Sequence, residues 1–126
     1  MNLKYIYKII NKEDLEKAKS SGTYSGSSKD IKDGFIHLST AAQLNATLSL
    51  YFAKEESVVL LQVDHSQTHD RIKFEAPIPT GNRSGLFPHY YGDLNIDAVS
   101  QVWHLKRSAF EMPIEVVLQA EQGANS

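Results

Sequence analysis

The sequence predicts a single α+β domain, and three observations lead to this prediction. The chain has 126 residues, a length that suits one domain with one hydrophobic core. Two helical patterns come early in the chain, whereas the remainder consists mainly of strand-like segments. This order differs from the regular strand–helix alternation of a doubly wound parallel sheet. No repeat or low-complexity segment divides the chain.

The chain is predicted to begin with a strand and a helix. Residues 3–10 (LKYIYKII) are rich in β-branched and aromatic side chains, which favour a strand. Asn11 is a suitable N-cap for a helix that runs through Lys19 and ends before Gly22. Residues 22–28 (GTYSGSS) then predict a turn-rich loop that reverses the chain or approaches a ligand closely.

A short strand and a second helix are predicted next. Residues 34–38 (GFIHL) have the apolar character of a strand. In residues 41–53, apolar side chains recur at helical spacing and define one apolar face. Thr40 together with Gln43 fits a capping box at the start of this helix.

Most of the remaining chain is predicted to be strand. Residues 57–64 (SVVLLQVD) are the most apolar run, so we expect them at the centre of the sheet. The alternation in residues 71–75 (RIKFE) predicts a half-buried strand, and the prolines and glycines of residues 76–86 predict a loop. The other expected elements are strands at 87–92 (FPHYYG), 99–105 (VSQVWHL) and 114–118 (IEVVL), and a flexible tail at 121–126. The predicted domain therefore spans residues 1–120.

Composition and charge exclude several classes of function. The net charge is −2 and the isoelectric point about 6.2, so we expect no extended nucleic-acid-binding surface. The absence of cysteine excludes disulfides, thiolate chemistry and cysteine-type zinc sites. No run approaches the ~18 apolar residues of a membrane helix, and the N-terminus lacks the apolar core of a secretory signal. We therefore expect a cytoplasmic protein with no membrane partner, either a monomer or a weak dimer.

The motif DGFIHLST, residues 33–40, places an imidazole inside an apolar strand. A neutral imidazole donates from one ring nitrogen and accepts at the other, so it can orient a sugar hydroxyl or move a proton. On a strand, His37 and Ser39 lie on the same face because they are two residues apart. Alternatively, His37 is a core histidine that bonds to the backbone, and Ser39 only caps the following helix. The spacing leaves both interpretations open.

Two later segments carry further candidates. Glu75 ends the alternating strand, where its carboxylate can stabilise a developing cation or accept a proton. The ordinary alternative is a solvated glutamate or one paired with a lysine. In FPHYYG, residues 87–92, the aromatic rings offer stacking faces for a flat heterocycle, and His89 adds a titratable group. An aromatic core strand followed by a turn explains the same segment equally well.

The sequence also contains a histidine pair and basic residues that bear on metal and phosphate binding. His65 and His69 have the four-residue spacing of a metal-binding pair on a helix, but their segment is polar and offers no third ligand. We therefore predict no metal. The sequence contains neither a GxxxxGK[ST] phosphate loop nor a GxSxG serine motif. Arg83 is one of several basic residues near the candidate segments that can form charge-assisted bonds to a phosphate.

Taken together, these motifs resemble the DUF952 family. The resemblance comprises YIYKI in the first strand, GxYxGSSxD at residues 22–30, DGFIHLST, the strand-end Glu75 and FPHYYG, and it spans roughly residues 3–105. DGFIHLST and FPHYYG are specific only in combination. This family is similar to the ADP-ribosyltransferase-like superfamily, and that similarity implies a bent, split β-sheet with a cleft that binds NAD in active relatives.

The resemblance also implies roles for particular residues. His37 matches a first-strand position that contacts the NAD ribose, with Ser39 as its partner. His89 is the candidate for a second position near nicotinamide, in a pattern similar to the two-histidine branch that includes RNA 2′-phosphotransferases. The late glutamate of classical transferases has no counterpart, because Glu75 precedes His89 in the chain.

Two hypotheses follow for the function. The first is an NAD-dependent transferase that moves an ADP-ribosyl group or removes a phosphate from a phosphorylated acceptor, which requires orientation and electrostatic stabilisation more than a metal. The second is a non-catalytic module that binds a nucleotide or another small molecule. We expect His37, Glu75 and His89 to face one cavity as the catalytic candidates. The expected ligand-binding residues are Tyr24, Ser27, Ser39, Thr40, Arg83, Tyr90 and Tyr91.

Overall fold

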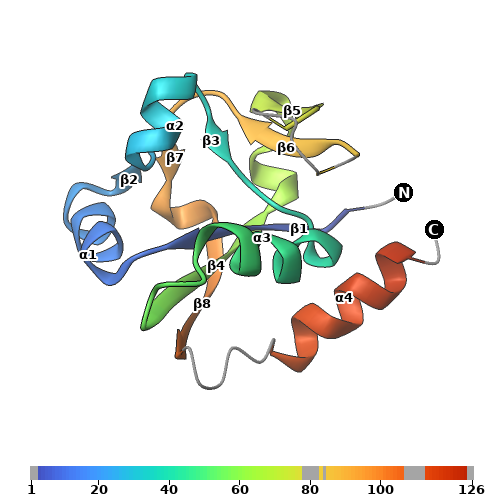
Figure 1. Cartoon of the computed structure of the whole chain (residues 1–126). Helices are drawn as coiled ribbons and strands as arrows, with labels where there is room; N and C mark the ends of the chain where they lie inside the picture. Colours follow the sequence, from blue (N-terminus) through green and yellow to red (C-terminus); the bar gives the residue numbers. More distant parts are fainter. Residues whose placement is uncertain (1–2, 78–82, 84, 107–112, 125–126) are drawn as a thin grey trace.

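A three-stranded antiparallel sheet forms the centre of the domain in a computed structural model of the chain (Figure 1). The structure describes residues 3–77, 83, 85–106 and 113–124. The sheet has the order β1-β4-β8, with strands β1 (Tyr5–Ile10), β4 (Ser57–Asp64) and β8 (Val99–Lys106). The prediction that the run SVVLLQVD is a central strand is confirmed, and its buried apolar residues are covered on both faces of this sheet.

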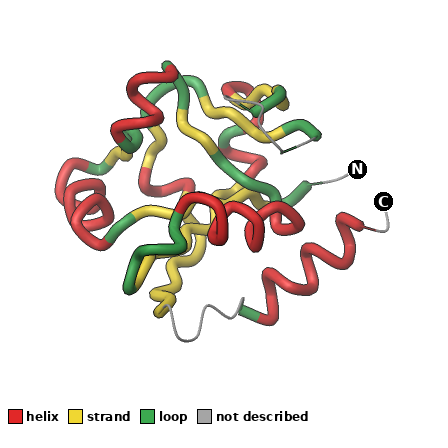
Figure 2. Tube along the Cα trace, viewed as in Figure 1, coloured by secondary structure: helices red, strands yellow, loops and turns green. Residues whose placement is uncertain are grey.

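Two smaller antiparallel sheets contain the other strands of the described chain. One joins β2 (Thr23–Tyr24) to β7 (Leu94–Asn95). The other has the order β3-β6-β5, with β6 (Phe87–Tyr90) between two partners, β3 (Ile36–His37) and β5 (Ile72–Glu75). The domain is thus of mixed α and β structure, with its strands divided among several antiparallel sheets (Figure 2).

The early helices follow the sequence predictions closely. Helix α1 (Lys12–Ser21) begins after Asn11, whose side chain accepts a hydrogen bond from the backbone of Asp14 at 2.7 Å. It ends at Gly22, which has φ +86°, a conformation that favours glycine. The predicted helix at 41–53 starts as a 3-10 turn, η1 (Ala41–Gln43), and continues as α3 (Leu44–Tyr51).

Two helices differ from the predictions. Helix α2 (Ser28–Asp33) lies in the segment that was expected to link a loop to a strand, and a capping box between Ser27 and Asp30 starts it. The predicted strand at 114–118 is wrong, because these residues begin helix α4 (Ile114–Ala124). Their β-branched side chains favour a strand locally, but Val116 is buried and α4 packs against η1. Helix α4 also includes most of the expected tail, and residues 125–126 lie outside the described residues.

The central sheet carries a hydrophobic cluster on each face. Alternate residues of β4 divide between them: Val59, Leu61 and Val63 belong to one cluster, Val58 and Leu60 to the other. The first cluster includes residues of α1 and of the smaller sheets, and the second includes residues of α3 and α4. In the parts of the chain that the structure describes, no helix is long and apolar enough to cross a membrane.

Candidate functional site

His37 and His89 lie directly opposite one another in the small sheet β3-β6-β5. His37 pairs with His89 in the antiparallel register, and the ring centroids are 5.4 Å apart in an edge-to-face arrangement. Both residues line one cavity of about 450 Å³. The expectation that two imidazoles distant in the chain meet at a shared cavity is therefore confirmed.

Each histidine has a carboxylate partner that also accepts from a second donor. His89 Nδ1 lies 2.8 Å from Glu75 Oε1, and the Tyr91 hydroxyl donates to the same oxygen at 2.7 Å. His37 Nε2 lies 2.8 Å from Asp33 Oδ2, and Lys29 Nζ lies 2.9 Å from that oxygen. The site therefore contains two carboxylate–histidine pairs, and in each pair the carboxylate fixes the orientation of the imidazole ring.

The electrostatics of these pairs determine which ring nitrogens carry protons. Hydrogen bonds from Tyr91 and His89 lower the pKa of Glu75, and hydrogen bonds from Lys29 and His37 lower the pKa of Asp33. Ionised carboxylates only accept, so His89 carries a proton on Nδ1 and His37 carries one on Nε2. Burial lowers the pKa of His37 although Asp33 opposes this shift, which favours the neutral ring near pH 7.

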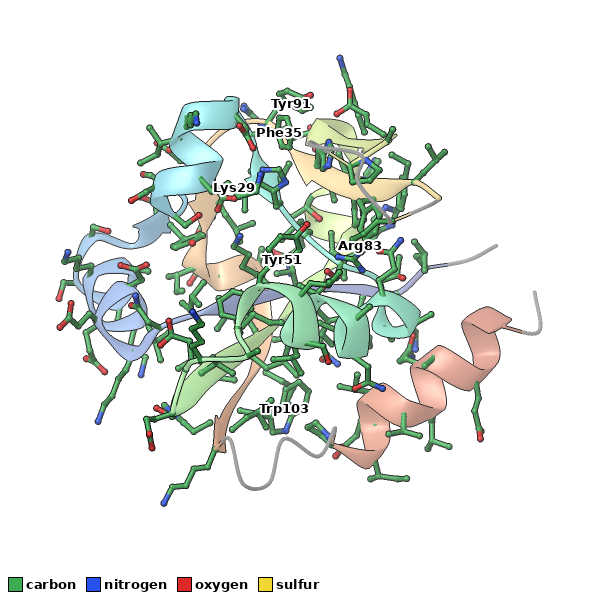
Figure 3. The ribbon with its side chains drawn as sticks, viewed as in Figure 1. Lys29, Phe35, Tyr51, Arg83, Tyr91 and Trp103 are labelled. Carbon is green, nitrogen blue, oxygen red and sulfur yellow. The ribbon has the colours of Figure 1, made fainter. Side chains whose placement is uncertain are left out.

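His89 Nε2 is a buried nitrogen without a hydrogen-bond partner among the described residues. The whole residue is 1% exposed, and Phe35 stacks on its ring at a centroid distance of 3.9 Å. Phe35 also contacts the His37 ring and lies beside Tyr91 (Figure 3). Unsatisfied buried polar atoms are costly and rare, so this nitrogen of a cavity-lining residue is an acceptor that lacks a donor.

A buried ion pair holds the backbone of His37 on both sides. Lys8 Nζ lies 2.8 Å from Asp30 Oδ2 and donates to the His37 carbonyl at 2.9 Å. Asp30 Oδ1 accepts from the His37 N–H at 3.0 Å. Both side chains are nearly inaccessible, and burial lowers the pKa of Lys8 although Asp30 opposes this shift. The pair therefore fixes the position of His37 at the cavity wall.

Sequence reasoning missed Lys8 and Asp30 as site residues, although signals for both were present. Lys8 interrupts an otherwise apolar strand, and a lysine at a buried strand position requires a partner. Asp30 is the last residue of the motif GxYxGSSxD, and its carboxylate also accepts from the Ser27 N–H at 2.9 Å.

Arg83 lines the cavity from the side of α3. It donates to Thr47 Oγ1 at 3.0 Å and to the Gln43 carbonyl at 3.3 Å, and its guanidinium lies 4.3 Å from the centroid of the Phe87 ring. Figure 3 shows Arg83 beside Tyr51 at the front of the molecule. Within the described parts of the chain no carboxylate pairs with Arg83, so its charge can serve an anionic ligand.

Hydroxyl groups complete this part of the wall. Ser39 lines the cavity, and its Oγ lies 3.0 Å from Thr47 Oγ1. The backbone of Ser39 forms an isolated bridge with Tyr7 of β1, so Ser39 follows β3 rather than continuing it. Ser27 also lines the cavity, next to the start of α2. The structure therefore brings Ser27, Ser39 and Arg83 to the cavity with the two histidines.

Two of the expected ligand-binding residues have other positions. Tyr90 follows His89 in β6 and therefore faces the opposite side of the sheet, where it belongs to the hydrophobic core and its hydroxyl contacts the Asp93 carbonyl at 3.4 Å. Thr40 caps the next helix, and its N–H donates to the Gln43 side chain at 2.9 Å, as the predicted capping box requires. Neither residue is among the described residues that line the cavity.

The other expected residues lie next to the cavity rather than in its wall. Glu75 and Tyr91 contact each other and adjoin the site through His89 and Phe35. Glu75 was expected to face the cavity; it is not among the described residues that line it, and its carboxylate bonds to the Nδ1 edge of His89. Tyr24 lines a second, smaller cavity that adjoins the first.

The remaining histidine pair of the sequence analysis does not form part of this site. The rings of His65 and His69 have centroids 6.3 Å apart, and His69 Nδ1 lies 3.1 Å from the Ser66 carbonyl. Among residues whose placement is described, no three side chains of histidine, aspartate or glutamate gather as a metal site.

These observations define a small antiparallel domain with a buried, carboxylate-supported histidine pair at one cavity. The model of the family described as "Protein of unknown function (DUF952)" matches residues 9–102, and the chain belongs to this family. The crystal structure of protein CC0527 from Caulobacter crescentus is similar, with a TM-score of 0.79 and 29% sequence identity over 90% of this chain and 98% of that chain. The solution structure of the same protein gives a TM-score of 0.70 and 33% identity over 82% of this chain and 86% of that chain. A search of curated proteins gives no match.

Proposed function

We propose that this chain binds a nucleotide of the NAD type in the cavity, with ribose hydroxyls at His37 and His89. The observation that carries this proposal is that His89 Nε2, a buried acceptor of a residue that lines the cavity, has no hydrogen-bond partner among the described residues. The other ring nitrogen, Nδ1, bonds to Glu75. A ligand hydroxyl that donates to Nε2 removes the cost of leaving this nitrogen unsatisfied.

The size and charge of the cavity support a nucleotide. Its volume of about 450 Å³ falls within the range of about 300–1,000 Å³ that small-molecule sites occupy. Of the cationic residues in its wall, Lys8 is paired with Asp30 and Lys29 with Asp33, so Arg83 is the cation that supports a phosphate. Arg83 bonds only to neutral acceptors among the described residues and can hold a phosphate.

Aromatic side chains at the same wall support a ligand with flat rings. Phe87 and Tyr51 both line the cavity, and the Arg83 guanidinium lies 4.3 Å from the Phe87 ring centroid and 6.0 Å from that of Tyr51. A base or nicotinamide ring can pack on such faces while the adjoining phosphate meets the arginine.

The resemblance to the ADP-ribosyltransferase-like superfamily adds a reaction to this proposal. An acceptor hydroxyl attacks C1′ of the nicotinamide ribose, the bond from C1′ to nicotinamide breaks, and nicotinamide leaves with the electron pair. The proton of the acceptor passes to His89 Nε2, and Glu75 stabilises the imidazolium through Nδ1. The two-histidine resemblance implies a 2′-phosphorylated RNA as another class of acceptor. An ionised phosphate oxygen then attacks C1′ in place of the hydroxyl, nicotinamide leaves with the electron pair, and no proton passes to His89.

One observation favours the second candidate, a binding module without turnover. Glu75 lies behind His89 and contributes nothing to the described wall of the cavity. Asp30, which does line it, is engaged by Lys8, Ser27 and the His37 backbone. Among the described residues, no free carboxylate therefore lies at the histidine pair to stabilise an oxocarbenium-like transition state.

Calorimetric titration with NAD, followed by chromatography for released nicotinamide, tests the proposal. We expect saturable binding by the wild type and an affinity loss of about tenfold or more in His89→Ala and His37→Ala. His104→Ala is the matched control, because His104 is an exposed histidine of β8 and should leave the affinity unchanged. Binding without nicotinamide release supports the module, and release that His89→Ala abolishes supports the transferase. A wild type that does not bind NAD contradicts the proposal.

A further inference from the structure

A second cavity of about 110 Å³ adjoins the histidine-lined cavity. The two cavities share part of their walls, including Lys8, Asn11, Asp14 and Ser27. A volume of this size accommodates several water molecules or one small planar group, since a single water needs only about 10–15 Å³. A ligand in the main cavity can therefore extend one of its ends into this second compartment.

Tyr24 lines the second compartment and has a buried hydroxyl without a partner among the described residues. The residue is 4% exposed, and its hydroxyl has no hydrogen-bond partner among the described residues. Burial raises the pKa of this hydroxyl far above its usual range, so it remains protonated and can donate. Tyr90, a tyrosine of the same hydrophobic cluster, has a carbonyl partner for its hydroxyl. In this cluster the Tyr90 hydroxyl therefore has a hydrogen-bond partner, whereas the Tyr24 hydroxyl has none among the described residues.

The charges around the second compartment favour a ligand group that donates. Asp14 and Glu55 line it, and neither forms an ion pair with another residue in the described ranges. Lys8 lines it too, but the Asp30 carboxylate at 2.8 Å balances its charge. The wall therefore combines the unpartnered Tyr24 with two carboxylate acceptors, Asp14 and Glu55, and these carboxylates disfavour an anionic group.

We infer that the second compartment binds a planar edge with an acceptor beside an N–H donor, the acceptor meeting the Tyr24 hydroxyl and the donor meeting Asp14 or Glu55. This inference rests on the proposed function for the identity of the whole ligand. Two parts of an NAD-type molecule carry such an edge: the carboxamide of nicotinamide and the amino-pyrimidine edge of adenine. A carboxylate or a second phosphate does not fit this wall.

Two tyrosine variants test the role of the hydroxyl. Tyr24→Phe removes only the unpartnered hydroxyl, so we expect the dissociation constant for NAD to rise about tenfold while the urea midpoint is unchanged or higher. Tyr90→Phe is the matched control, because it removes a partnered hydroxyl outside both cavities and should lower the urea midpoint without changing NAD affinity. An unchanged dissociation constant in Tyr24→Phe overturns the inference.

Two dinucleotide analogues identify the edge. Nicotinic acid adenine dinucleotide replaces the carboxamide by a carboxylate, and nicotinamide hypoxanthine dinucleotide replaces the adenine amino group by a carbonyl. We expect the wild type to bind one of them about tenfold more weakly than NAD, and Tyr24→Phe to show a smaller difference because the shared contact is lost. Equal affinity for all three dinucleotides overturns the inference.

Fragment binding separates this inference from the proposed function. Nicotinamide and adenine are tested at millimolar concentration by ligand-observed NMR against the wild type and Tyr24→Phe. If NAD does not bind, the proposed function fails, whereas a fragment that binds only the wild type still supports the second compartment. If neither NAD nor a fragment binds the wild type, both proposals are overturned. If NAD binding depends on His89 and not on Tyr24, only the inference fails.

Discussion

The central sheet β1-β4-β8 and the small sheet β3-β6-β5 are built from different kinds of residues. Strand β4 has an unbroken buried run of Val58, Val59, Leu60, Leu61, Gln62 and Val63. The small sheet instead places His37, His89 and Glu75 on one face, because these positions are opposite or two apart in the register. Its other face, with Ile36 and Tyr90, joins the hydrophobic core.

The difference shows that stability and chemistry occupy separate parts of this domain. Apolar burial is the main favourable contribution to folding, and most of it lies on the two faces of the central sheet. Buried polar groups are tolerated in the small sheet because carboxylates orient them. Lys8 links the two sheets, since it belongs to β1 of the central sheet and its ammonium donates to the backbone of the small sheet.

Removal of the Asp30 carboxylate should lower the stability of the fold most, because Asp30 connects the two sheets through Lys8. Asp30→Ala leaves a buried ammonium without its counter-charge, and we expect the free energy of unfolding to fall by about 3–5 kcal/mol. Urea denaturation measures this change. Glu16→Ala, at an exposed position of α1, should change stability by less than about 0.5 kcal/mol.

A double variant separates the charge from the loss of packing at this position. Adding Lys8→Met to Asp30→Ala removes the isolated ammonium, so part of the lost stability should return. A single variant that loses less than about 1 kcal/mol, or a double variant less stable than Asp30→Ala, would contradict a stabilising buried pair.

Truncation within the central sheet should lower stability without changing the site. Leu60 is fully buried at the centre of β4, and Leu60→Ala should cost about 2–5 kcal/mol. The imidazole resonances of His37 and His89, followed by NMR under native conditions, should stay in place because both rings belong to the small sheet, whereas Leu60 belongs to the central sheet. Val102→Thr, at an exposed position of the edge strand β8, should cost less than about 0.5 kcal/mol. Displaced histidine resonances in Leu60→Ala would show that the two sheets are coupled.

Acid should lower the free energy of unfolding in two stages, through His37 and then Glu75 of the small sheet. We expect this loss to be smaller than that caused by Asp30→Ala or Leu60→Ala. Burial lowers the pKa of His37 below its ordinary value of 6.5, so the unfolded chain takes up the proton first and stability falls as the pH drops below 6.5. Hydrogen bonds lower the pKa of Glu75 from 4.5, so its contribution is complete above pH 4.5 and is lost as the pH falls towards the depressed value.

Urea midpoints measured from pH 8 to pH 3 test these two stages. His37→Gln should remove the stage that begins near pH 6.5, and Glu75→Gln should reduce the stage below pH 4.5. A wild-type midpoint that stays constant between pH 7 and pH 5 would show that His37 is not buried in its neutral form.

The sequence was sufficient to predict those elements that are specified by residues close together in the chain. The apolar run of β4 and the caps of α1 follow from side-chain pattern and from the needs of helix ends. The meeting of His37 and His89 was predicted from the resemblance to a family, since no local rule specifies which strands pair. Periodicity also distinguishes Tyr90 from His89, because adjacent strand residues face opposite sides.

The missed features depend on contacts between distant segments. Helix α4 forms from a β-branched run because its apolar residues pack on η1, a tertiary effect that intrinsic propensity does not include. The partnership of Lys8 with Asp30 joins residues on different elements, and only the fold brings them within 2.8 Å.

The short length of β3 has a consequence for the response of the site to salt. A strand of two residues contributes few ladder hydrogen bonds, so the Lys8–Asp30 pair supplies much of what keeps His37 in place. Mobile ions screen exposed charges far more than buried ones. The shape of the histidine wall should therefore persist in concentrated electrolyte, even where a phosphate held at Arg83 dissociates.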